Sequence, residues 1–299
     1  FLAGGAFPAA AQSRAETLRY VTGATINTLD TTMPGATREA FGLSMNVYDR
    51  LFSFGRKKVG ENWAFDPDTI RGELAKSYSI SPDSKVITIT LRSDATWHDG
   101  TPVTAEDVKW SLDRHVTAKS LAAPQFTTGS LTKADQFKIV DPQTVTVTLE
   151  KPDRLALANL CVCYAIMINS KLAKKHATAD DPWAMEWMKT NTAASGAYIV
   201  DSHKPGESTV LRRNEKWLGG AGGALPFFKR VIIQTVPEAA TRANLIERGD
   251  ADLAIDLAAS DLPTIEKSAK SKVVSIPQTN GFTHISMNTQ MAPFDNLKV

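Results

Sequence analysis

Two segments of the chain alternate β-branched and aliphatic residues with a period of two. They are SKVITITLR (84–92) and QTVTVTLE (143–150). This is the period of a strand with one buried face and one exposed face. Strands of a parallel sheet, buried on both faces, carry continuous apolar runs instead, so alternation with threonine favours an antiparallel or mixed sheet. The chain is therefore predicted to contain a largely antiparallel or mixed sheet.

Helical spacing elsewhere predicts an α/β protein. The segment REAFGLSMNVYDRLF (38–52) has large apolar residues three or four apart, which is typical of an amphipathic helix. Further strands are predicted at 17–23 and 208–214. The apolar face of the predicted helix comprises Phe41, Met45, Tyr48 and Phe52.

The region 229–256 predicts a strand, a helix and a second strand in succession. KRVIIQTV (229–236) is a continuous apolar run, and DADLAID (250–256) has the composition of a short strand. Between them, the predicted helix has Pro237 in its first turn and stops at Gly249, the usual asymmetry of helix ends. A strand–helix–strand unit of this kind joins parallel strands.

Length and charge limit the classes of protein that the chain can belong to. At 299 residues it exceeds the size at which one core stays compact, so two lobes are expected. The 34 basic and 32 acidic residues almost cancel, which indicates no polyanionic partner such as nucleic acid.

The first fifteen residues resemble the end of an export signal. The run from Phe1 to Ala11 is apolar, and small residues that suit signal peptidase end at Ala11 and at Ala15. The run is too short to span a bilayer. We therefore expect an exported protein, with an alanine-rich tail of no targeting role as the alternative.

The stretch WHDGTPVTAEDVKWSL (97–112) contains a histidine and three acids, which invites a catalytic interpretation. Thr104 and Asp107, three residues apart before an apolar helical run, have the spacing of a capping box. Negative charge is favoured in a first helical turn, so Glu106 and Asp107 have a structural explanation. A general base needs a nucleophile within hydrogen-bond reach, and the stretch supplies none for His98. A scaffold role is favoured over an exported hydrolase that uses the acids near His98.

Cysteine and histidine patterns are poor candidates for metal sites. Cys161 and Cys163, in the apolar run ANLCVCYAIMIN, would share one face of a strand. They are interpreted as small buried residues, with a disulfide or a metal site as weaker alternatives. The five histidines form no i, i+4 pair, and we predict no cofactor and no metal site.

The region 74–112 resembles the family 5 extracellular solute-binding proteins, the receptors of ABC importers. The resemblance rests on a Leu-Ala start, an alternating strand, the turn His-Asp-Gly-Thr-Pro and the helix start Thr-Ala-Glu-Asp-Val, in that order. It extends to TLDTTM (28–33), NVYDRLF (46–52), LRRNEKWLGG (211–220) and FTHISMNTQMAPFDNLKV (282–299). The chain departs from the family at ASGAY (194–198), where Gly-Thr-Gly-Pro-Tyr is usual. The dipeptide-binding type is the most similar.

The resemblance implies an α/β, two-lobed periplasmic-binding-protein-like fold with mixed sheets, here the first lobe plus the start of the second. Ligand would be captured between the lobes, because only contacts with both lobes favour the closed form. The expected division is 1–15 as signal-peptide remnant, 16–45 as the first part of lobe I, 46–192 as its accessory subdomain, 193–254 as its second part and 255–299 as the start of lobe II.

The resemblance also implies three ligand-binding segments. They are the loop after the first strand, the end of the strand at Asp256, and the segment TNGF. Alternatives stay open, since Asp30 could form a turn, Asn280-Gly281 could be a simple turn, and Phe282 and Met287 could belong to the core. The expected ligand-binding residues are Thr28, Leu29, Asp30, Thr31, Thr32, Met33, Asp256, Thr279, Asn280, Gly281 and Phe282.

The leading hypothesis is therefore a periplasmic, monomeric receptor that carries no catalytic residue. It would bind a small molecule, with a short peptide favoured and nickel left open as a subclass, and deliver it to an ABC permease in the inner membrane. The alternatives are the exported hydrolase and a chaperone-like peptide binder.

Overall fold

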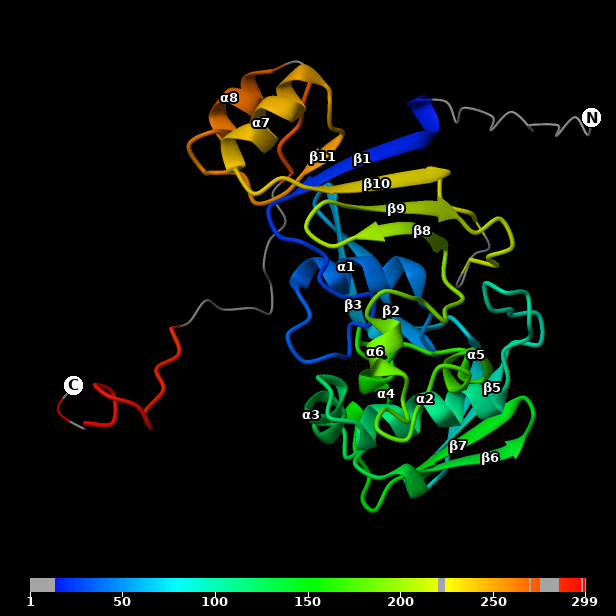
Figure 1. Cartoon of the computed structure of the whole chain (residues 1–299). Helices are drawn as coiled ribbons and strands as arrows, with labels where there is room; N and C mark the ends of the chain where they lie inside the picture. The colour runs from blue at the N-terminus through cyan, green and yellow to red at the C-terminus, as the bar shows by residue number, and fades with distance from the viewer. Residues whose placement is uncertain (1–13, 220–223, 269, 275–284, 297, 299) are drawn as a thin grey trace, which may run out of the picture.

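The computed structural model describes residues 14–219, 224–268, 270–274, 285–296 and 298. Strands and helices alternate along the chain in a mixed α/β arrangement with several sheets (Figure 1). The segment 1–13, which holds most of the predicted signal remnant, lies outside the described residues. The predicted division of the chain at residues 45, 192 and 254 stays a prediction.

A five-stranded sheet forms the upper part of the molecule in Figure 1. Its edge strand β11 pairs in parallel with β1, which pairs in parallel with β10, while β9 and β8 continue the sheet antiparallel. The sheet is therefore mixed. In spatial order the strands are β11 (Leu253–Ala254), β1 (Thr17–Thr22), β10 (Arg230–Thr235), β9 (Ser208–Arg213) and β8 (Tyr198–Lys204).

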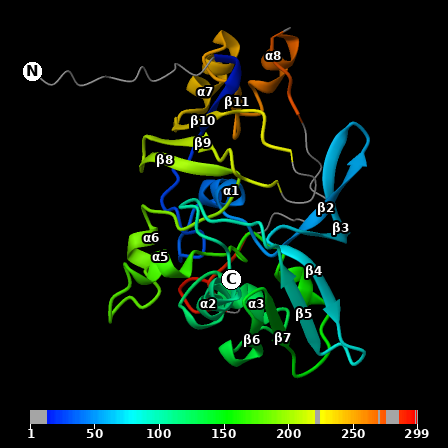
Figure 2. The same ribbon diagram turned by 90° about the vertical axis from the view of Figure 1, so that its right-hand side faces the viewer.

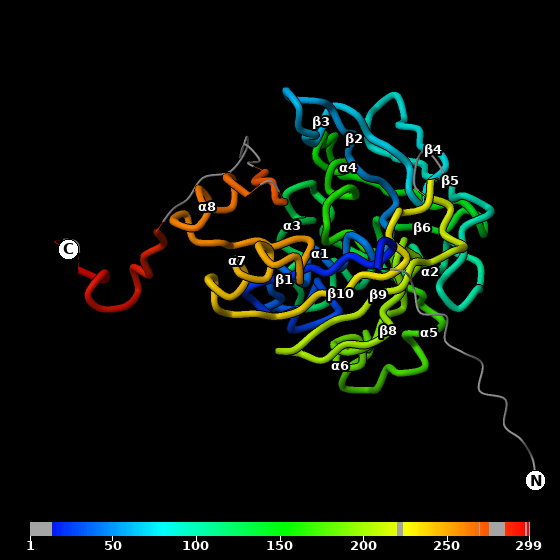
Figure 3. The backbone as a smooth tube through the Cα atoms, turned by 90° about the horizontal axis from the view of Figure 1, so that it is seen from above, coloured from blue at the N-terminus to red at the C-terminus, as the bar shows by residue number. Residues whose placement is uncertain are grey.

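A four-stranded antiparallel sheet and a long hairpin form the rest of the β structure. The hairpin projects at one side of the molecule when it is seen from above (Figure 3). It consists of β2 (Phe52–Val59) and β3 (Asn62–Gly72). The four-stranded sheet has the order β4 (Ala75–Ile80), β5 (Val86–Leu91), β7 (Thr144–Thr148) and β6 (Phe137–Asp141).

Helices lie at both ends of the five-stranded sheet and around the four-stranded one. Helices α7 and α8 lie beside β11, and α1 lies below the sheet (Figures 1 and 2). The helices are α1 (Arg38–Val47), α2 (Ala105–Thr117), α3 (Ala122–Thr127), α4 (Leu155–Asn159), α5 (Ser170–Lys174), α6 (Met185–Met188), α7 (Ala239–Arg248) and α8 (Leu262–Lys267), with 3-10 turns at Arg14–Glu16 and Ala134–Gln136.

The predicted alternation of 84–92 and 143–150 is confirmed. In β5 the buried positions are Ile87, Ile89 and Leu91, and in β7 they are Val145 and Val147. This face packs on α2 in one hydrophobic core, and a second core joins α1 to the five-stranded sheet. Helix α2 contributes to both cores, with Val108 and Leu112 in the first and Trp110 in the second.

The predicted helix 38–52 is wrong in its length and in its buried face. Helix α1 ends at Val47, and Tyr48 has extended backbone angles. Met45 is exposed, whereas Leu43 and Val47 are buried. The helix stops because the next residues bond to other segments: the Arg50 backbone N–H donates to the Glu73 carboxylate (2.8 Å) and the Asp49 carbonyl accepts from the Met167 N–H (2.9 Å).

Gly196 allows the chain before β8 to pass close to the end of α1. Its N–H donates to the Val47 carbonyl (2.8 Å), and a Cβ at this position would lie 2.5 Å from the Val47 carbonyl carbon. Only glycine permits this approach. The glycine of ASGAY is thus explained by packing.

The predicted strand–helix–strand unit is confirmed, but its two strands are not neighbours in the sheet. Strands β10 and β11 both run parallel to β1, which lies between them. Helix α7 ends at Gly249, which has a left-handed conformation and caps the helix as predicted. Pro237 precedes the N-cap residue Glu238 instead of lying in the first turn. The second strand is only two residues long, shorter than the predicted 250–256.

The two cysteines do not lie on a strand, contrary to the sequence prediction. They follow α4 in a turn, and both are free thiols. Cys161 is buried in the core that contains β5, and burial raises the pKa of its thiol to about 12. Cys161 therefore serves as a small apolar side chain.

Candidate ligand-binding site

A cavity of about 840 Å³ lies between the five-stranded sheet and α1. This volume is within the range of roughly 300–1,000 Å³ that is usual for small-molecule sites. Residues of one sheet face form an apolar wall, α1 forms the opposite wall, and the chain after β11 closes one end. The lining residues are Leu18, Tyr20, Ile26, Arg38, Glu39, Gly42, Leu43, Asn46, Tyr198, Leu211, Val231, Ile233, Leu253, Ile255, Asp256 and Val274.

The sheet register explains why the apolar wall forms. Leu18 is paired with Val231, and Tyr20 with Ile233, so all four side chains point to the same face. Burial raises the pKa of the Tyr20 phenol, which therefore stays neutral at physiological pH. This wall offers a neutral surface to an apolar or amphipathic ligand.

Charged groups gather at one end of the cavity. The Arg38 guanidinium pairs with the carboxylate of Asp256 and, at 3.1 Å, with that of Glu39. Glu39 also accepts a hydrogen bond from the Thr22 hydroxyl (3.4 Å). Hydrogen bonds from Arg38 to the carboxylates of Asp256 and Glu39 raise the pKa of the Arg38 guanidinium. Arg38 is therefore positively charged at physiological pH.

Asp256 is the only one of the sequence-predicted ligand residues among the described residues that line this cavity. Its φ of 56° lies in the left-handed region, which is unusual for a residue with a side chain. Its carbonyl accepts a hydrogen bond from the buried Arg242, which holds the backbone in place. Whether Asp256 contacts a ligand stays a prediction.

The loop 28–33 lies beneath the surface and does not line the cavity. The residues from Thr28 to Thr32 are all buried, and Met33 is half-buried. Asp30 forms the turn that was weighed as its alternative role, because its carboxylate accepts from the Thr32 N–H (3.0 Å) and hydroxyl (2.7 Å). A ligand could reach Thr28 to Thr32 only if the loop moved, whereas Met33 is partly accessible.

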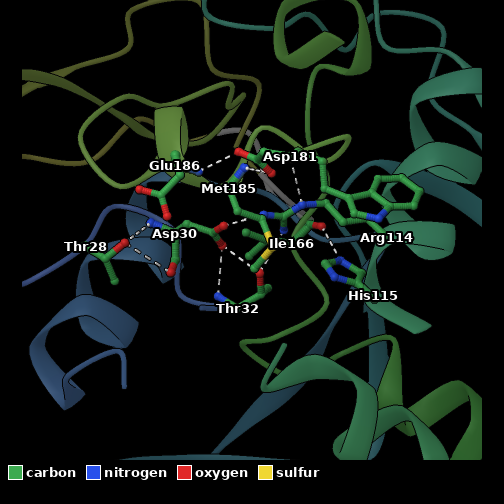
Figure 4. Close-up of polar contacts among 10 residues, drawn as sticks. Thr28, Asp30, Thr32, Arg114, His115, Ile166, Asp181, Met185 and Glu186 are labelled. Carbon is green, nitrogen blue, oxygen red and sulfur yellow. Dashed lines mark hydrogen bonds and ion pairs between the residues drawn. The ribbon is translucent and has the colours of Figure 1, made fainter. Parts of the chain in front are cut away.

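The Asp30 carboxylate is also paired with Arg114 of α2, far away in the sequence. Figure 4 shows the two side chains pointing toward one another. Both are completely buried, and Arg114 also donates to the Thr32 hydroxyl (2.8 Å) and the Trp183 carbonyl (3.4 Å). Burial alone would raise the pKa of Asp30, but the Arg114 charge and hydrogen bonds hold it below its usual value. The loop is therefore joined rigidly to α2.

His115, next to Arg114, is a neutral structural histidine. Its Nε2 lies 2.8 Å from the Ile166 carbonyl, to which it donates (Figure 4). Burial, together with the Arg114 charge, lowers the pKa of His115 to about 4. His115 is thus a buried, neutral part of the framework.

The lowered pKa of His115 predicts how stability depends on pH. An unfolded histidine titrates near 6.5, so between about 6.5 and about 4 the unfolded chain binds more protons than the folded chain. The free energy of unfolding should therefore fall as the pH is lowered through this range, by on the order of 3 kcal/mol from this residue. Urea unfolding of the protein and of His115→Gln at pH 7 and pH 4.5 measures the difference. If the free energy of unfolding changed equally with pH in both proteins, His115 would not be the source of the pH dependence.

The other predicted ligand segment, Thr279 to Phe282, lies outside the described residues. Met287, which was expected in the core, is 59% exposed, so that expectation is wrong. The reason is that the hydrogen bonds of residues 285–296, among the described residues, join only near neighbours in sequence. Among the described residues, 285–296 thus have no hydrogen bond to a core element.

Two of the three acids of 97–112, Asp99 and Asp107, form structural bonds, as the scaffold interpretation predicted, and Glu106 is exposed in the first turn of α2. The Asp107 carboxylate accepts from the Thr104 N–H (3.0 Å), which completes the capping box. Asp99 holds the turn through the Thr101 N–H (2.9 Å). His98 lies 3.0 Å from the Gly196 carbonyl, and burial lowers the pKa of its ring. His98 and Asp99 thus bond to different segments and form no catalytic dyad.

A second, much smaller cavity of about 20 Å³ lies beside Asp49. The Asp49 carboxylate accepts from the Ser195 hydroxyl (2.8 Å) and the Trp217 indole N–H (3.1 Å). Burial, with Glu73 nearby, raises the pKa of Asp49 to about 6. The volume suits about one water molecule. This cavity is too small for the ligands considered above.

Sequence reasoning missed Arg38, Glu39 and Tyr20. A cation in the first turn of a helix opposes the helix dipole, so Arg38 at the start of α1 was a signal that a tertiary contact holds it. Tyr20 gave no comparable signal, because a tyrosine in a strand is ordinary.

Within the described residues, every helix is too short or too polar to cross a lipid bilayer.

Comparisons with known proteins agree with the resemblance. The model of the bacterial extracellular solute-binding proteins, family 5 Middle, matches residues 69–299. The Probable D,D-dipeptide-binding periplasmic protein DdpA of Escherichia coli is 34% identical over 248 residues, which cover 83% of this chain and 45% of that protein. The chain thus spans about half the length of this relative.

Solved structures show the same fold. The binding protein AgaA of A. tumefaciens, in complex with agropinic acid, gives a TM-score of 0.69 at 26% identity, covering 85% of this chain and 46% of that one. MoaA of A. tumefaciens, in complex with mannopinic acid, gives 0.76 at 23% identity, covering 94% and 53%. The predicted periplasmic-binding-protein-like fold is confirmed, as is the prediction of a binding-protein family instead of a hydrolase family. The chain belongs to family 5 of the bacterial extracellular solute-binding proteins.

Proposed function

We propose that this chain is part of an exported receptor that binds a small solute for an ABC importer. The observation that carries the proposal is the cavity of about 840 Å³, with an apolar sheet face on one side and charged groups at one end. Ligand pockets combine mainly apolar walls with few polar groups in this way. Family membership supports the receptor role, while periplasmic location, a monomeric state and delivery to a membrane permease are parts of the proposal.

A short peptide or a compound of similar size is the proposed ligand. The support comes from a relative named for D,D-dipeptides and from a structure in complex with agropinic acid. The proposed ligand surface comprises the cavity with Asp256, the half-buried Met33 and, from the sequence alone, residues 279–282. Binding would favour closure only through contacts with a second lobe as well.

Thermal unfolding of the full chain with a panel of L,L- and D,D-dipeptides and agropinic acid tests the proposal. A ligand present at one hundred times its Kd stabilises the folded protein by about 2.7 kcal/mol, which raises the Tm measurably. No rise with any member of the panel would contradict the peptide-type receptor.

A variant that fills the cavity gives the control. Gly42 lines the cavity from α1, and a Cβ at this position meets nothing within 4 Å. Gly42→Phe should therefore fold and lose the ligand-induced rise in Tm. Met45→Phe places the same ring at an exposed position of the same helix and should keep that rise. If Gly42→Phe responds like the wild type, the ligand binds elsewhere.

A further inference from the structure

The hairpin of β2 and β3 exposes two aromatic rings on one face. Trp63 is 61% exposed and Phe65 is 67% exposed. They lie two residues apart in β3, so their side chains point to the same side of the hairpin. Single apolar residues are ordinary on a protein surface, whereas two neighbouring large rings form a patch that calls for an explanation. The hairpin projects from the molecule, and neither ring belongs to either hydrophobic core (Figure 3).

Two cations lie across the hairpin from these rings. Lys58 is paired with Trp63, and Arg56 is paired with Phe65. Directly paired residues point to the same side of a sheet, so the four side chains share one face. The Lys58 ammonium lies 5.6 Å from the centroid of the Trp63 ring, which is the distance of a cation–π contact. We call these four residues the basic-aromatic face.

The opposite face of the hairpin has a different character. Lys57 points to that face and pairs with the Asp66 carboxylate at 3.5 Å, so its charge is balanced. The residue paired with Lys57 is the small Ala64. Glu61, the other acid of residues 56–66, lies in the turn at the tip. The basic-aromatic face thus carries two cations, two rings and no acid.

The size of the basic-aromatic face limits what can cover it. Two aromatic side chains bury about 150–250 Å² each. A stable protein–protein interface buries about 800 Å² on each partner, so this face alone is too small for one. A lipid bilayer needs no shape-matched partner surface. Aromatic rings lie favourably at the level of its headgroups, and Lys and Arg contact anionic headgroups while their stems cover apolar surface.

We infer that the basic-aromatic face docks on the surface of a bilayer that contains anionic phospholipid. Trp63 and Phe65 lie at the level of the headgroups, and Arg56 and Lys58 contact the lipid phosphates. The contact is peripheral and reversible, because two rings and two cations give only weak anchoring. It goes beyond the proposed function and does not depend on which solute the cavity binds.

Sedimentation with lipid vesicles tests the inference. The full chain is mixed with vesicles of phosphatidylcholine alone, or with vesicles of an equimolar mixture of phosphatidylcholine and phosphatidylglycerol. It should sediment with the anionic vesicles and be released by high salt, because salt screens the attraction between exposed charges. No binding to the anionic vesicles, or equal binding to both kinds, would overturn the inference.

Two single variants test the part that the rings play. Phe65→Ser should weaken binding to the anionic vesicles about fivefold or more, because an apolar ring no longer leaves water. Phe227→Ser is the matched control, since it removes a ring that is 71% exposed and lies outside the hairpin. It should leave binding unchanged. Both rings are exposed, so both variants should fold, and an unchanged Tm checks this. Equal losses in the two variants would remove the hairpin as the docking element.

A pair of lysine variants tests the part that the charges play. Lys58→Gln and Lys57→Gln remove the same charge from opposite faces of β2. Lys58→Gln should weaken binding to the anionic vesicles about fivefold, because its charge meets the headgroups directly. Lys57→Gln should weaken it about twofold or less, since the attraction falls off within a Debye length. Equal effects would show that net charge, and not this face, causes the binding.

Two further measurements identify what covers the rings. Lipids brominated in their acyl chains should quench part of the tryptophan fluorescence of the wild type but not of Trp63→Phe, which keeps a ring and should still bind. Equal quenching in both proteins would place another tryptophan in the membrane and overturn the inference. Sedimentation velocity without vesicles tests a second copy as the occupant. A dimer that Phe65→Ser dissociates would assign the face to self-association instead of lipid.

Discussion

Arg114→Met should lower the free energy of unfolding by about 3–5 kcal/mol, the usual cost of removing one partner from a buried ion pair. The reason is that Asp30 stays completely buried with its charge uncompensated. The Thr32 hydroxyl and the Trp183 carbonyl also lose a donor. Urea unfolding, followed by tryptophan fluorescence, measures the change in the free energy of unfolding. The loop 28–33 should also become more mobile in this variant.

Arg212→Met is the matched control. Arg212 pairs with Asp201 at 2.8 Å, but the two side chains are 52% and 41% exposed. Exposed pairs of this kind contribute at most about 1 kcal/mol. If the two variants lost similar amounts, the buried pair would not be what joins the loop to α2.

Asp107→Ala should cost about 3 kcal/mol or more, well above the about 1 kcal/mol of a helix cap alone. The larger value follows from the other bonds of this carboxylate. It accepts from the Ser170 N–H (3.0 Å), the Ser170 hydroxyl (2.6 Å) and the Trp97 indole N–H (3.3 Å) in addition to Thr104. Since Asp107 is 1% exposed, water cannot replace these bonds without opening the structure.

Glu106→Ala is the control for the helix-dipole contribution. Glu106 lies in the same helical turn and is exposed, so its loss should cost less than about 1 kcal/mol through the helix dipole. Thermal unfolding of both variants at one pH makes the comparison. A loss near 1 kcal/mol for Asp107→Ala would show that its bonds to α5 and to Trp97 contribute little.

Several elements were predictable because their causes lie within a few residues. The alternation in β5 needs only the two faces of one strand, and the capping box needs only Thr104 and Asp107. Gly249 ends α7 because glycine adopts the left-handed conformation without a steric penalty. The same local patterns carry the family resemblance of 74–112.

The sequence predictions fall short where contacts between distant segments, instead of local spacing, decide the conformation. Helical spacing of apolar residues continues past Val47, but the chain there is extended. Its Arg50 N–H donates to the Glu73 carboxylate, and its Asp49 carbonyl accepts from the Met167 N–H. The turn at Asp30 was foreseen, but the bond of its carboxylate to Arg114, eighty-four residues away, was not. In both cases a buried polar group needs a partner, and spacing alone does not reveal which one is near.

The sequence by itself determined the family, the mixed α/β class and the local design of the strand and helix around Gly100, because periodicity, capping and turn chemistry act over short range. Only the tertiary structure decided that Asp107 bonds to α5, that Asp30 is buried against Arg114, and that Arg38 meets Asp256 at the end of a cavity. Chain folding brings these groups together, and burial then makes each pairing either stabilising or costly according to whether its charges are matched.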